Sequence, residues 1–175
     1  DPVRSAIHRA VEIADDLGVP VAFDVNFREH LWESVAAARE VVNPLFDRSR
    51  VVKLSDDELS PLLGTDSPEE AARRMLDRGV ELVFVSLGPD GAFYATKDFS
   101  GRVPAYEVEL VDPTGAGDAF LAAALVHLAG RSFDEESVRE AVLRGAATGA
   151  LACTDYGAMR ALPTKGELER FMAGG

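Results

Sequence analysis

The spacing of apolar residues changes repeatedly along the chain, between the 3.6-residue period of a helix and the short runs typical of a buried strand. The helical period predicts helices over residues 5–17, 34–42, 56–63, 68–78, 119–128 and 135–152, and a last short helix after Pro163. Short apolar or alternating runs predict strands over residues 19–26, 50–54, 81–87, 92–96 and 102–111. Strands that alternate with helices in this way are typical of an α/β fold with a mostly parallel sheet.

Local signals mark the ends of several predicted elements. Ser67, Pro68 and Glu70 have the spacing of an N-cap, a first-turn proline and a capping-box glutamate. The segment 88–91, Gly-Pro-Asp-Gly, predicts a tight turn between two antiparallel strands. The run 19–26 has the composition of a strand that is buried on both faces.

Polar residues follow three of the predicted strands. Asp24 and Asn26 end the first, Lys53 and Ser55 end the second, and Ser86 ends the third. Ligands of open α/β sheets bind at the carboxyl ends of the strands. Because three separate strands bring polar side chains to that edge, we expect a ligand site there.

The sequence GAGD at residues 115–118 joins a glycine turn to a predicted helix. Gly115 and Gly117 carry no side chain and Ala116 only a methyl group, so backbone N–H groups can approach an anion closely. Asp118 could orient and deprotonate an attacking hydroxyl. The alternative interpretation is a glycine turn whose acid caps the helix. The turn is not a P-loop, because no lysine-serine or lysine-threonine pair follows it.

Two further motifs each allow a structural and a functional interpretation. Asp24, Asn26 and Arg28 lie just past a strand, where Arg28 could bind a phosphate or a sugar hydroxyl, or the group could form a turn with a surface ion pair. Glu58 lies three residues after Ser55, as in a capping box. The functional interpretation is that Glu58 holds waters around a phosphate-bound Mg²⁺.

Other segments favour a structural interpretation when taken alone. The glycine turn over 85–91 is typical of a hairpin, and the small residues over 144–152 either allow close helix packing or wall a flat ligand. The three histidines lack the spacing of metal ligands. Cys153 is predicted to be a small core residue and not a nucleophile.

Composition and charge narrow the classes of partner. The 175 residues are 47% hydrophobic, which suits one soluble domain with a core. A net charge of −12 argues against nucleic acid and against an anionic membrane surface as partners. The single cysteine excludes an intramolecular disulfide and fits a reducing compartment, so we expect a cytoplasmic location.

Four motifs in this order resemble the C-terminal half of the PfkB or ribokinase-like carbohydrate kinases: KLSDDEL, VSLGPDG, VDPTGAGDAF and GALACTDYGAMRALP. The resemblance implies a three-layer α/β/α fold with a mostly parallel central sheet. It also implies that residues 1–175 form the C-terminal nucleotide-binding and catalytic portion of a single domain, whose N-terminal part and lid are missing. Ser55, together with the pattern over 24–32, resembles the fructokinase and 2-keto-3-deoxygluconate kinase branch.

The resemblance implies an ATP-dependent sugar kinase that uses ATP and Mg²⁺. Asp118 would be the base, and the amides of Gly115, Ala116 and Gly117 the anion hole. Asp24, Asn26, Arg28 and Asp118 are the candidate sugar-binding residues. The implied nucleotide-binding residues are Lys53, Ser55, Ser86, Gly88, Gly91, Ala146, Ala147 and Gly149. Glu58 would organise Mg²⁺ through water, and Asp112 with the Thr114 carbonyl would bind K⁺.

Other interpretations remain open on the sequence. The enzyme could be a 2-keto-3-deoxygluconate kinase or a ribokinase-type kinase, or the chain could be a nucleotide-binding fragment without catalysis. We expect the chain alone not to turn over sugar, because the missing part would position the substrate and exclude water. Members of the family commonly form dimers through the lid, which implies a homodimer for the full-length protein.

Overall fold

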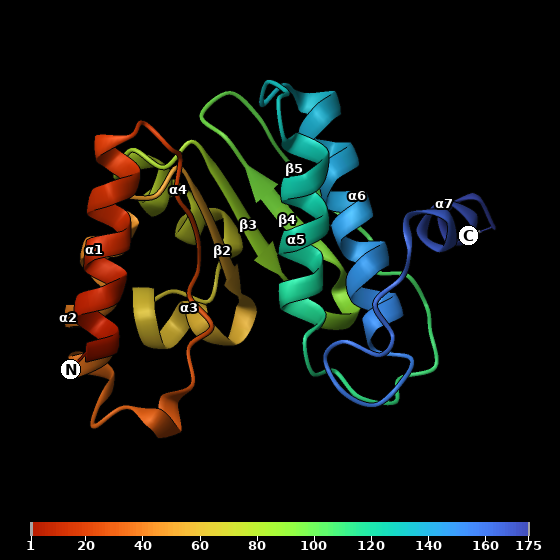
Figure 1. Ribbon diagram of the computed structural model, residues 1–175, viewed down its shortest axis with the longest axis horizontal. Coiled ribbons are helices and arrows are strands. Elements are labelled where there is room, and N and C mark those ends of the chain that lie inside the picture. Colours follow the sequence, from red (N-terminus) through yellow and green to blue (C-terminus); the bar gives the residue numbers. More distant parts are fainter. Residues whose placement is uncertain (1, 175) are drawn as a thin grey trace.

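A computed structural model describes residues 2–174 and confirms the α/β architecture (Figure 1). The strands are β1 (Ala22–Asp24), β2 (Val51–Ser55), β3 (Leu82–Ser86), β4 (Ala92–Ala95) and β5 (Ser100–Val103). The helices are α1 (Pro2–Asp16), α2 (Val35–Phe46), α3 (Asp56–Leu63), α4 (Pro68–Asp77), α5 (Ala116–Leu128), α6 (Glu135–Ala152) and α7 (Lys165–Gly174). Two 3-10 turns, η1 (Glu29–Leu31) and η2 (Gly88–Asp90), complete the list.

The five strands form one mixed sheet in the order β1-β2-β3-β4-β5. The first three strands are parallel, and β4 and β5 are antiparallel to their neighbours, as expected for the hairpin after β3. The register sets Asp24 beside Lys53 and Ser55 beside Ser86. The polar residues predicted at the strand ends therefore lie together at the carboxyl edge of the parallel strands.

Side-chain alternation along the strands divides the core between the two faces of the sheet. Val52, Leu54, Val83 and Val85 pack with α2, α3 and α4, whereas Val51, Leu82 and Phe84 pack with α5 and α6. These two helical layers lie on opposite sides of the sheet, which is the expected three-layer arrangement (Figure 1). Lys53 lies two residues from Val51 and so belongs to the face that α5 covers.

Small residues let α5 and α6 pack closely. A side-chain carbon at Gly145 would lie 2.9 Å from the Phe120 ring, and one at Gly149 would lie 3.0 Å from the Ala116 carbonyl oxygen. Ala147 is fully buried. Of the two interpretations of the small residues in this helix, the structure shows close helix packing.

The strand predicted over residues 19–26 is shorter and less buried than expected. Only Ala22 to Asp24 pair with β2, and the strand is half-exposed. In the sheet of the described residues, β1 is an edge strand. Pro20 has no N–H to donate to a ladder, and Val19 before it is 53% exposed. The prediction of burial on both faces is therefore wrong for this strand.

The strand predicted over residues 102–111 is also displaced. The structure has β5 at Ser100–Val103, and the chain from 104 to 110 has no regular structure. The partner strand β4 begins at Ala92, which pairs with Val103. Pairing cannot continue beyond that point, because the partner chain turns away and Pro104 lacks an N–H.

The first helix forms as predicted, but its apolar face is not covered by the described residues. None of the α1 residues is buried, and Ile7 and Ile13 are 44% and 43% exposed. Its end is tied to the body of the fold by an ion pair between Asp15 and Arg48. No helix within residues 2–174 combines the length and the apolar character needed to cross a lipid bilayer.

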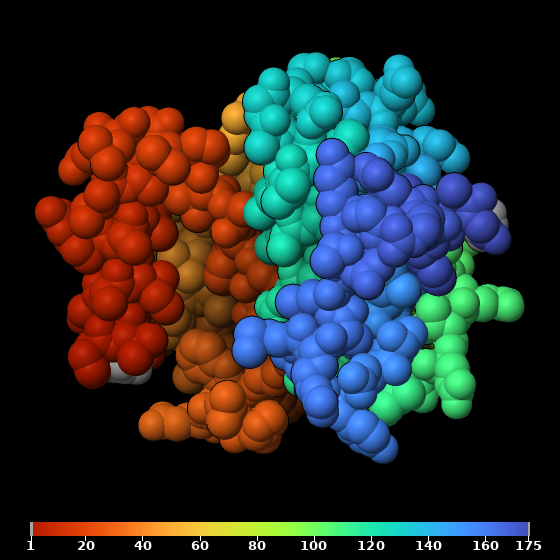
Figure 2. All heavy atoms as spheres, turned by 45° about the vertical axis from the view of Figure 1, so that its right-hand side comes forward, coloured from red at the N-terminus to blue at the C-terminus, as the bar shows by residue number. Residues whose placement is uncertain are grey.

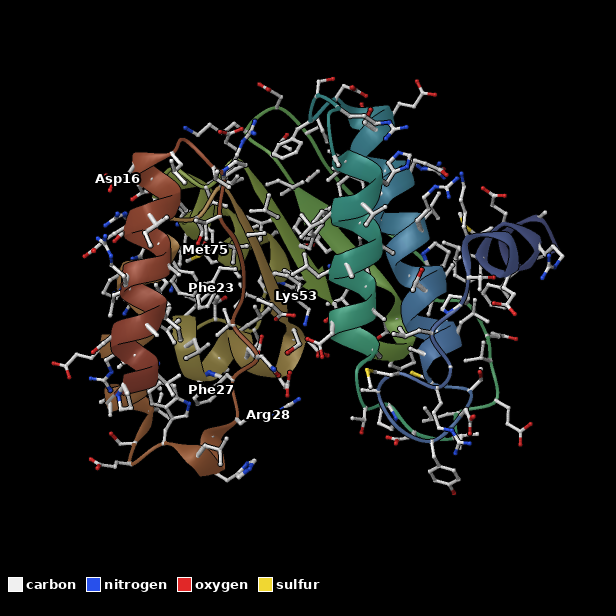
Figure 3. The ribbon with its side chains drawn as sticks, in the orientation of Figure 1. Asp16, Phe23, Phe27, Arg28, Lys53 and Met75 are labelled. Atoms are coloured by element: carbon white, nitrogen blue, oxygen red, sulfur yellow. The ribbon has the colours of Figure 1, made fainter. Side chains whose placement is uncertain are left out.

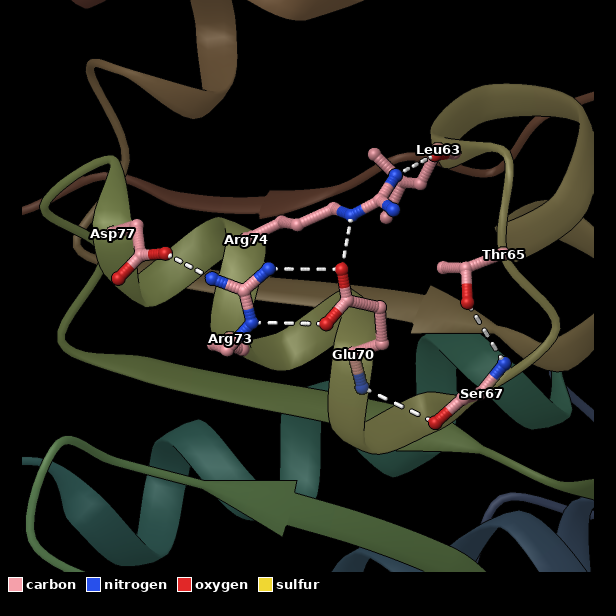
Figure 4. Close-up of polar contacts among 7 residues, drawn as sticks. All are labelled: Leu63, Thr65, Ser67, Glu70, Arg73, Arg74 and Asp77. Atoms are coloured by element: carbon pink, nitrogen blue, oxygen red, sulfur yellow. Dashed lines mark hydrogen bonds and ion pairs between the residues drawn. The ribbon is translucent and has the colours of Figure 1, made fainter.

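The structure confirms the serine cap at the start of α4 but not the predicted capping box, because the Ser67 N–H donates to the Thr65 hydroxyl at 3.2 Å and not to Glu70 (Figure 4). The Ser67 hydroxyl accepts the Glu70 N–H at 3.2 Å, and the Glu70 carboxylate pairs with Arg73 and Arg74 (Figure 4). The cap satisfies a backbone donor that the helix itself leaves without a partner.

Replacing Ser67 by alanine is expected to lower the free energy of unfolding by about 1 kcal/mol, because this donor loses its acceptor. Urea denaturation measures the change. Ser60 is the matched control, since it is exposed and makes no side-chain hydrogen bond among residues 2–174. Ser60→Ala should change stability by less than about 0.5 kcal/mol. Equal losses in the two variants would contradict the capping role.

Candidate active site

The glycine turn before α5 forms the start of that helix. Gly115 is the N-cap, in the left-handed region at φ 85°, and α5 begins at Ala116, three residues earlier than predicted. A side-chain carbon at Gly115 would also lie 2.8 Å from the Ala158 methyl group. Position 115 therefore requires glycine for both its backbone conformation and its close contact.

The amides of this turn are not all equally available to an anion. The Ala116 N–H donates to the Pro113 carbonyl at 3.2 Å. The N–H groups of Gly115 and Gly117 have no acceptor among the described residues. Free N–H groups at a helix start, with the positive end of the helix dipole, form a site that favours anions. Of the three amides in the predicted anion hole, those of Gly115 and Gly117 are therefore the free donors.

Asp118 lies in the first turn of α5 and is exposed. Its carboxylate makes no hydrogen bond within residues 2–174, and the cap position belongs to Gly115. The alternative interpretation of Asp118 as the helix cap is therefore wrong. A carboxylate that is close to the anion-binding turn, exposed and not committed to the backbone can accept a proton from a bound hydroxyl.

Lys53 and Asp24 form a largely buried ion pair beside this turn. The Lys53 Nζ lies 3.3 Å from the Asp24 Oδ1, with side chains 7% and 15% exposed. From β2 the lysine extends toward the first turn of α5 (Figure 3), where a side-chain carbon at Gly117 would lie only 2.7 Å from Nζ. Burial raises the pKa of Asp24, Lys53 opposes that rise, and the negative charge of Asp118 adds to it.

Glu58 forms the capping box that the sequence predicted. One carboxylate oxygen accepts the Ser55 N–H at 2.8 Å, and the other accepts the Phe27 N–H at 2.5 Å. Burial raises the pKa of Glu58, and the two backbone hydrogen bonds oppose that rise. The bond to Phe27 was not predicted, since it joins positions 31 apart in sequence, and it holds the loop after β1 against the start of α3. A role for Glu58 toward Mg²⁺ stays a prediction.

The expected turn after β3 is confirmed. The Leu87 N–H donates to the Gly91 carbonyl at 2.8 Å, and the segment between them is η2. Gly88 adopts φ 55° and faces open space, whereas a side-chain carbon at Gly91 would lie 2.0 Å from the Val103 carbonyl oxygen. Ser86 hydrogen-bonds the Leu54 carbonyl at 3.4 Å. Ser86, which pairs with Ser55, is therefore partly exposed, and Gly88 is exposed just after it. Position 91 requires glycine, because a side chain there would clash with the Val103 carbonyl.

The remaining predicted residues divide between core, loop and surface. Ala147 and Gly149 are buried, Gly149 against Ala116 of α5, while Ala146 on the same helix is partly exposed. Arg28 is exposed at the start of η1, and the exposed Asn26 has φ 45°, a left-handed conformation that asparagine tolerates. The structure does not bring the small residues of α6 to an open surface as a group.

Asp112 joins the loop before α5 to the segment after α6. Its two carboxylate oxygens accept the N–H groups of Thr114 and Gly157, each at 2.9 Å. The Thr114 side chain lowers the pKa of Asp112 most, and these two backbone bonds lower it further. The Cys153 carbonyl accepts the N–H groups of both Val111 and Asp112. Burial raises the pKa of the Cys153 thiol, but the residue is half-buried and belongs to neither core cluster, so the prediction of a core position is wrong. Binding of K⁺ by Asp112 and the Thr114 carbonyl stays a prediction.

Comparison with known proteins decides the family. A model described as pfkB family carbohydrate kinase matches residues 1–165. The chain belongs to the pfkB family of carbohydrate kinases. This agrees with the resemblance carried by the four sequence motifs, and the ribokinase-like α/β fold expected from it is confirmed.

Individual relatives of this pfkB chain are sugar and riboside kinases. Fructokinase-1 of Oryza sativa subsp. japonica is 40% identical over 176 residues, 98% of this chain and 54% of that protein. A crystal structure of fructokinase from Vibrio cholerae O395, with fructose, ADP and calcium bound, has a TM-score of 0.91 at 36% identity and covers 98% of this chain and 56% of that chain. Aminoimidazole riboside kinase from Salmonella enterica, in complex with aminoimidazole riboside and an ATP analogue, has a TM-score of 0.84 at 34% identity, over 94% and 56% of the two chains. The pfkB chain therefore spans about half the length of the relatives it matches.

The structure brings several of the candidate site residues of this pfkB chain together at the carboxyl edge of the parallel strands. Asp24, Lys53, Gly117 and Asp118 lie together, and Ser55 with Glu58 follows on the same edge. In the space-filling view the surface is hollowed between the N-terminal segments and α5 with α6 (Figure 2). No three His, Cys, Asp or Glu side chains among residues 2–174 are grouped to hold a metal ion directly.

Proposed function

We propose that the whole protein is an ATP-dependent sugar kinase of the fructokinase type, which transfers the γ-phosphoryl group to a sugar hydroxyl. The observation that supports it most directly is the start of α5. There the free N–H groups of Gly115 and Gly117, the uncommitted Asp118 carboxylate and the Lys53 ammonium lie within one turn of a helix. An anion site with a base and a cation beside it is what phosphoryl transfer to an alcohol requires.

In this proposal Asp118 takes the proton from the sugar hydroxyl as its oxygen attacks the γ-phosphorus. The bond from the γ-phosphorus to the bridging oxygen breaks, and ADP leaves. Gly115 and Gly117 donate their N–H groups to the phosphoryl oxygens, with a further contribution from Ala116, and the α5 dipole stabilises the charge that gathers there. Asp24, Asn26 and Arg28 would bind the sugar.

The nucleotide would lie along Ser55, Ser86 and Gly88, and reach Gly91 and the exposed edge of α6 at Ala146, with Ala147 and Gly149 behind it. The free N–H groups of the glycine turn and the buried Lys53 ammonium together suit the negative charge of a polyphosphate. Mg²⁺ neutralises phosphate charge when bound, and Glu58 would hold it through water, since both its oxygens already accept backbone N–H groups.

A substrate panel tests this proposal. With ATP and Mg²⁺, the whole protein is expected to phosphorylate fructose faster than ribose or 2-keto-3-deoxygluconate, as measured by ADP release in a coupled assay. A preference for either of the other sugars would identify the alternative specificity. Nucleotide binding without phosphorylation of any sugar would show a non-catalytic module. The 175-residue chain alone is expected to show no turnover.

A further inference from the structure

Lys53 places a buried cation between the two sides of the candidate active site. On one side its Nζ lies 3.3 Å from the Asp24 Oδ1, and on the other it lies so near the first turn of α5 that a side-chain carbon at Gly117 would come within 2.7 Å of it. In the register of the sheet the lysine is flanked by Asp24 on β1 and Phe84 on β3. The ammonium is therefore held at the point where the predicted sugar and phosphate sites meet.

The hydrogen bonds of this ammonium are incomplete. A lysine ammonium has three donors, and among residues 2–174 its acceptor is the Asp24 Oδ1. Buried charged donors are stabilised by further acceptors, because water no longer solvates them. Two donors of Lys53 are thus available to oxygens of an anion bound at Gly115 and Gly117.

Three carboxylates lie around this ion pair. Asp24 pairs with Lys53 directly, the Lys53 charge also favours the ionised form of Glu58, and the charge of Asp118 raises the Asp24 pKa. An anion at the start of α5 would bring more negative charge to this cluster and draw the lysine away from Asp24.

We infer that Lys53 is a shared cation: it pairs with Asp24 while the α5 anion site is free, and turns to phosphate oxygens when a nucleotide binds. The exchange leaves the Asp24 carboxylate free to accept a hydrogen bond from a sugar hydroxyl. It rests on the proposed function and goes beyond it by linking the two substrate sites through one side chain. It also explains the glycine at 117, since a side chain there would displace Lys53 from the place between its partners.

The test is calorimetric titration of the whole protein with ADP in the presence of Mg²⁺. Lys53→Met is expected to weaken ADP binding by about tenfold or more, because charge-assisted hydrogen bonds to phosphate are lost. Lys97→Met is the matched control, since Lys97 is exposed and distant from the site, and it should leave binding unchanged.

The direction of the change in ADP affinity in Asp24→Asn distinguishes the exchange from a purely structural ion pair. ADP should bind about threefold tighter or more, because a buried Lys53 that has lost its partner gains more from the phosphates. If the ion pair only holds β1 to β2, both Asp24→Asn and Lys53→Met should weaken ADP binding. That result, or an unchanged affinity in Lys53→Met, would overturn the inference.

The double variant Asp24→Asn with Lys53→Met shows whether a loss of ADP binding in a single variant is due to misfolding. Removing both charges leaves no unpaired buried ion, so this variant should fold, as checked by thermal unfolding. Its ADP affinity should equal that of Lys53→Met alone, because Asp24 acts on the nucleotide only through Lys53. A further change in affinity would contradict the exchange. Absence of ADP binding by the unsubstituted whole protein would refute the proposed function and this inference with it, whereas binding without the gain in Asp24→Asn would refute the inference alone.

Discussion

Replacing Asp118 by asparagine in the whole protein is expected to lower kcat by about 10²- to 10⁴-fold, the usual contribution of a general base. The amide has nearly the shape of the carboxylate but cannot accept the proton of the sugar hydroxyl. Asp118 makes no hydrogen bond to the described part of the fold, so its loss should leave the helix start intact. Rate measurements at saturating sugar and ATP isolate this effect.

ADP binding separates the catalytic role of Asp118 from a structural one. The affinity of Asp118→Asn for ADP should stay within a few-fold of the unsubstituted protein, or rise slightly because one negative charge near the phosphates is gone. Asp98→Asn, in the exposed turn between β4 and β5, is the matched control and should leave kcat unchanged. Full turnover in Asp118→Asn would rule out this residue as the base.

Replacing Phe84 by alanine is expected to lower the free energy of unfolding by about 3–5 kcal/mol, the range for a large side chain removed from a tight core. Phe84 is fully buried on the central strand β3, and its ring packs edge-on against Phe120 of α5 at 5.7 Å between centroids. The cavity would open directly under the helix that carries the anion-binding turn. Urea denaturation of the 175-residue chain measures the loss.

Val126→Ala is the control for this stability prediction. Val126 is on the same helix as Phe120 but 76% exposed, so its truncation should change stability by less than about 0.5 kcal/mol. Similar losses in the two variants would show that α5 does not pack on the sheet as described.

Features governed by short-range interactions could be predicted from the sequence. The cap at Ser67, the turn between Gly88 and Gly91 and the capping box at Glu58 each depend on residues within a few positions of one another. The sequence also predicted which residues lie at the carboxyl edge of the sheet, because strand ends and polar residues coincide.

Features governed by distant segments could not be predicted in the same way. The bond from Phe27 to Glu58 and the pairing of Asp24 with Lys53 depend on which strands become neighbours. The burial of β1 depends on its place at the edge of the described sheet, which its own apolar run does not encode. The start of α5 at Ala116 depends on the left-handed conformation of Gly115, which a helical period does not reveal.

The exposed helix α1 has a consequence for how the 175-residue chain unfolds when it is taken by itself. Since none of its residues is buried, melting α1 uncovers little apolar surface and opens no cavity in either core cluster. Local unfolding of α1 should therefore need little free energy and occur separately, while β2, β3, α5 and α6 unfold together. The turn at Gly115 and Lys53 belong to this more stable cooperative unit. Local unfolding of α1 should therefore leave the geometry of the candidate anion site unchanged.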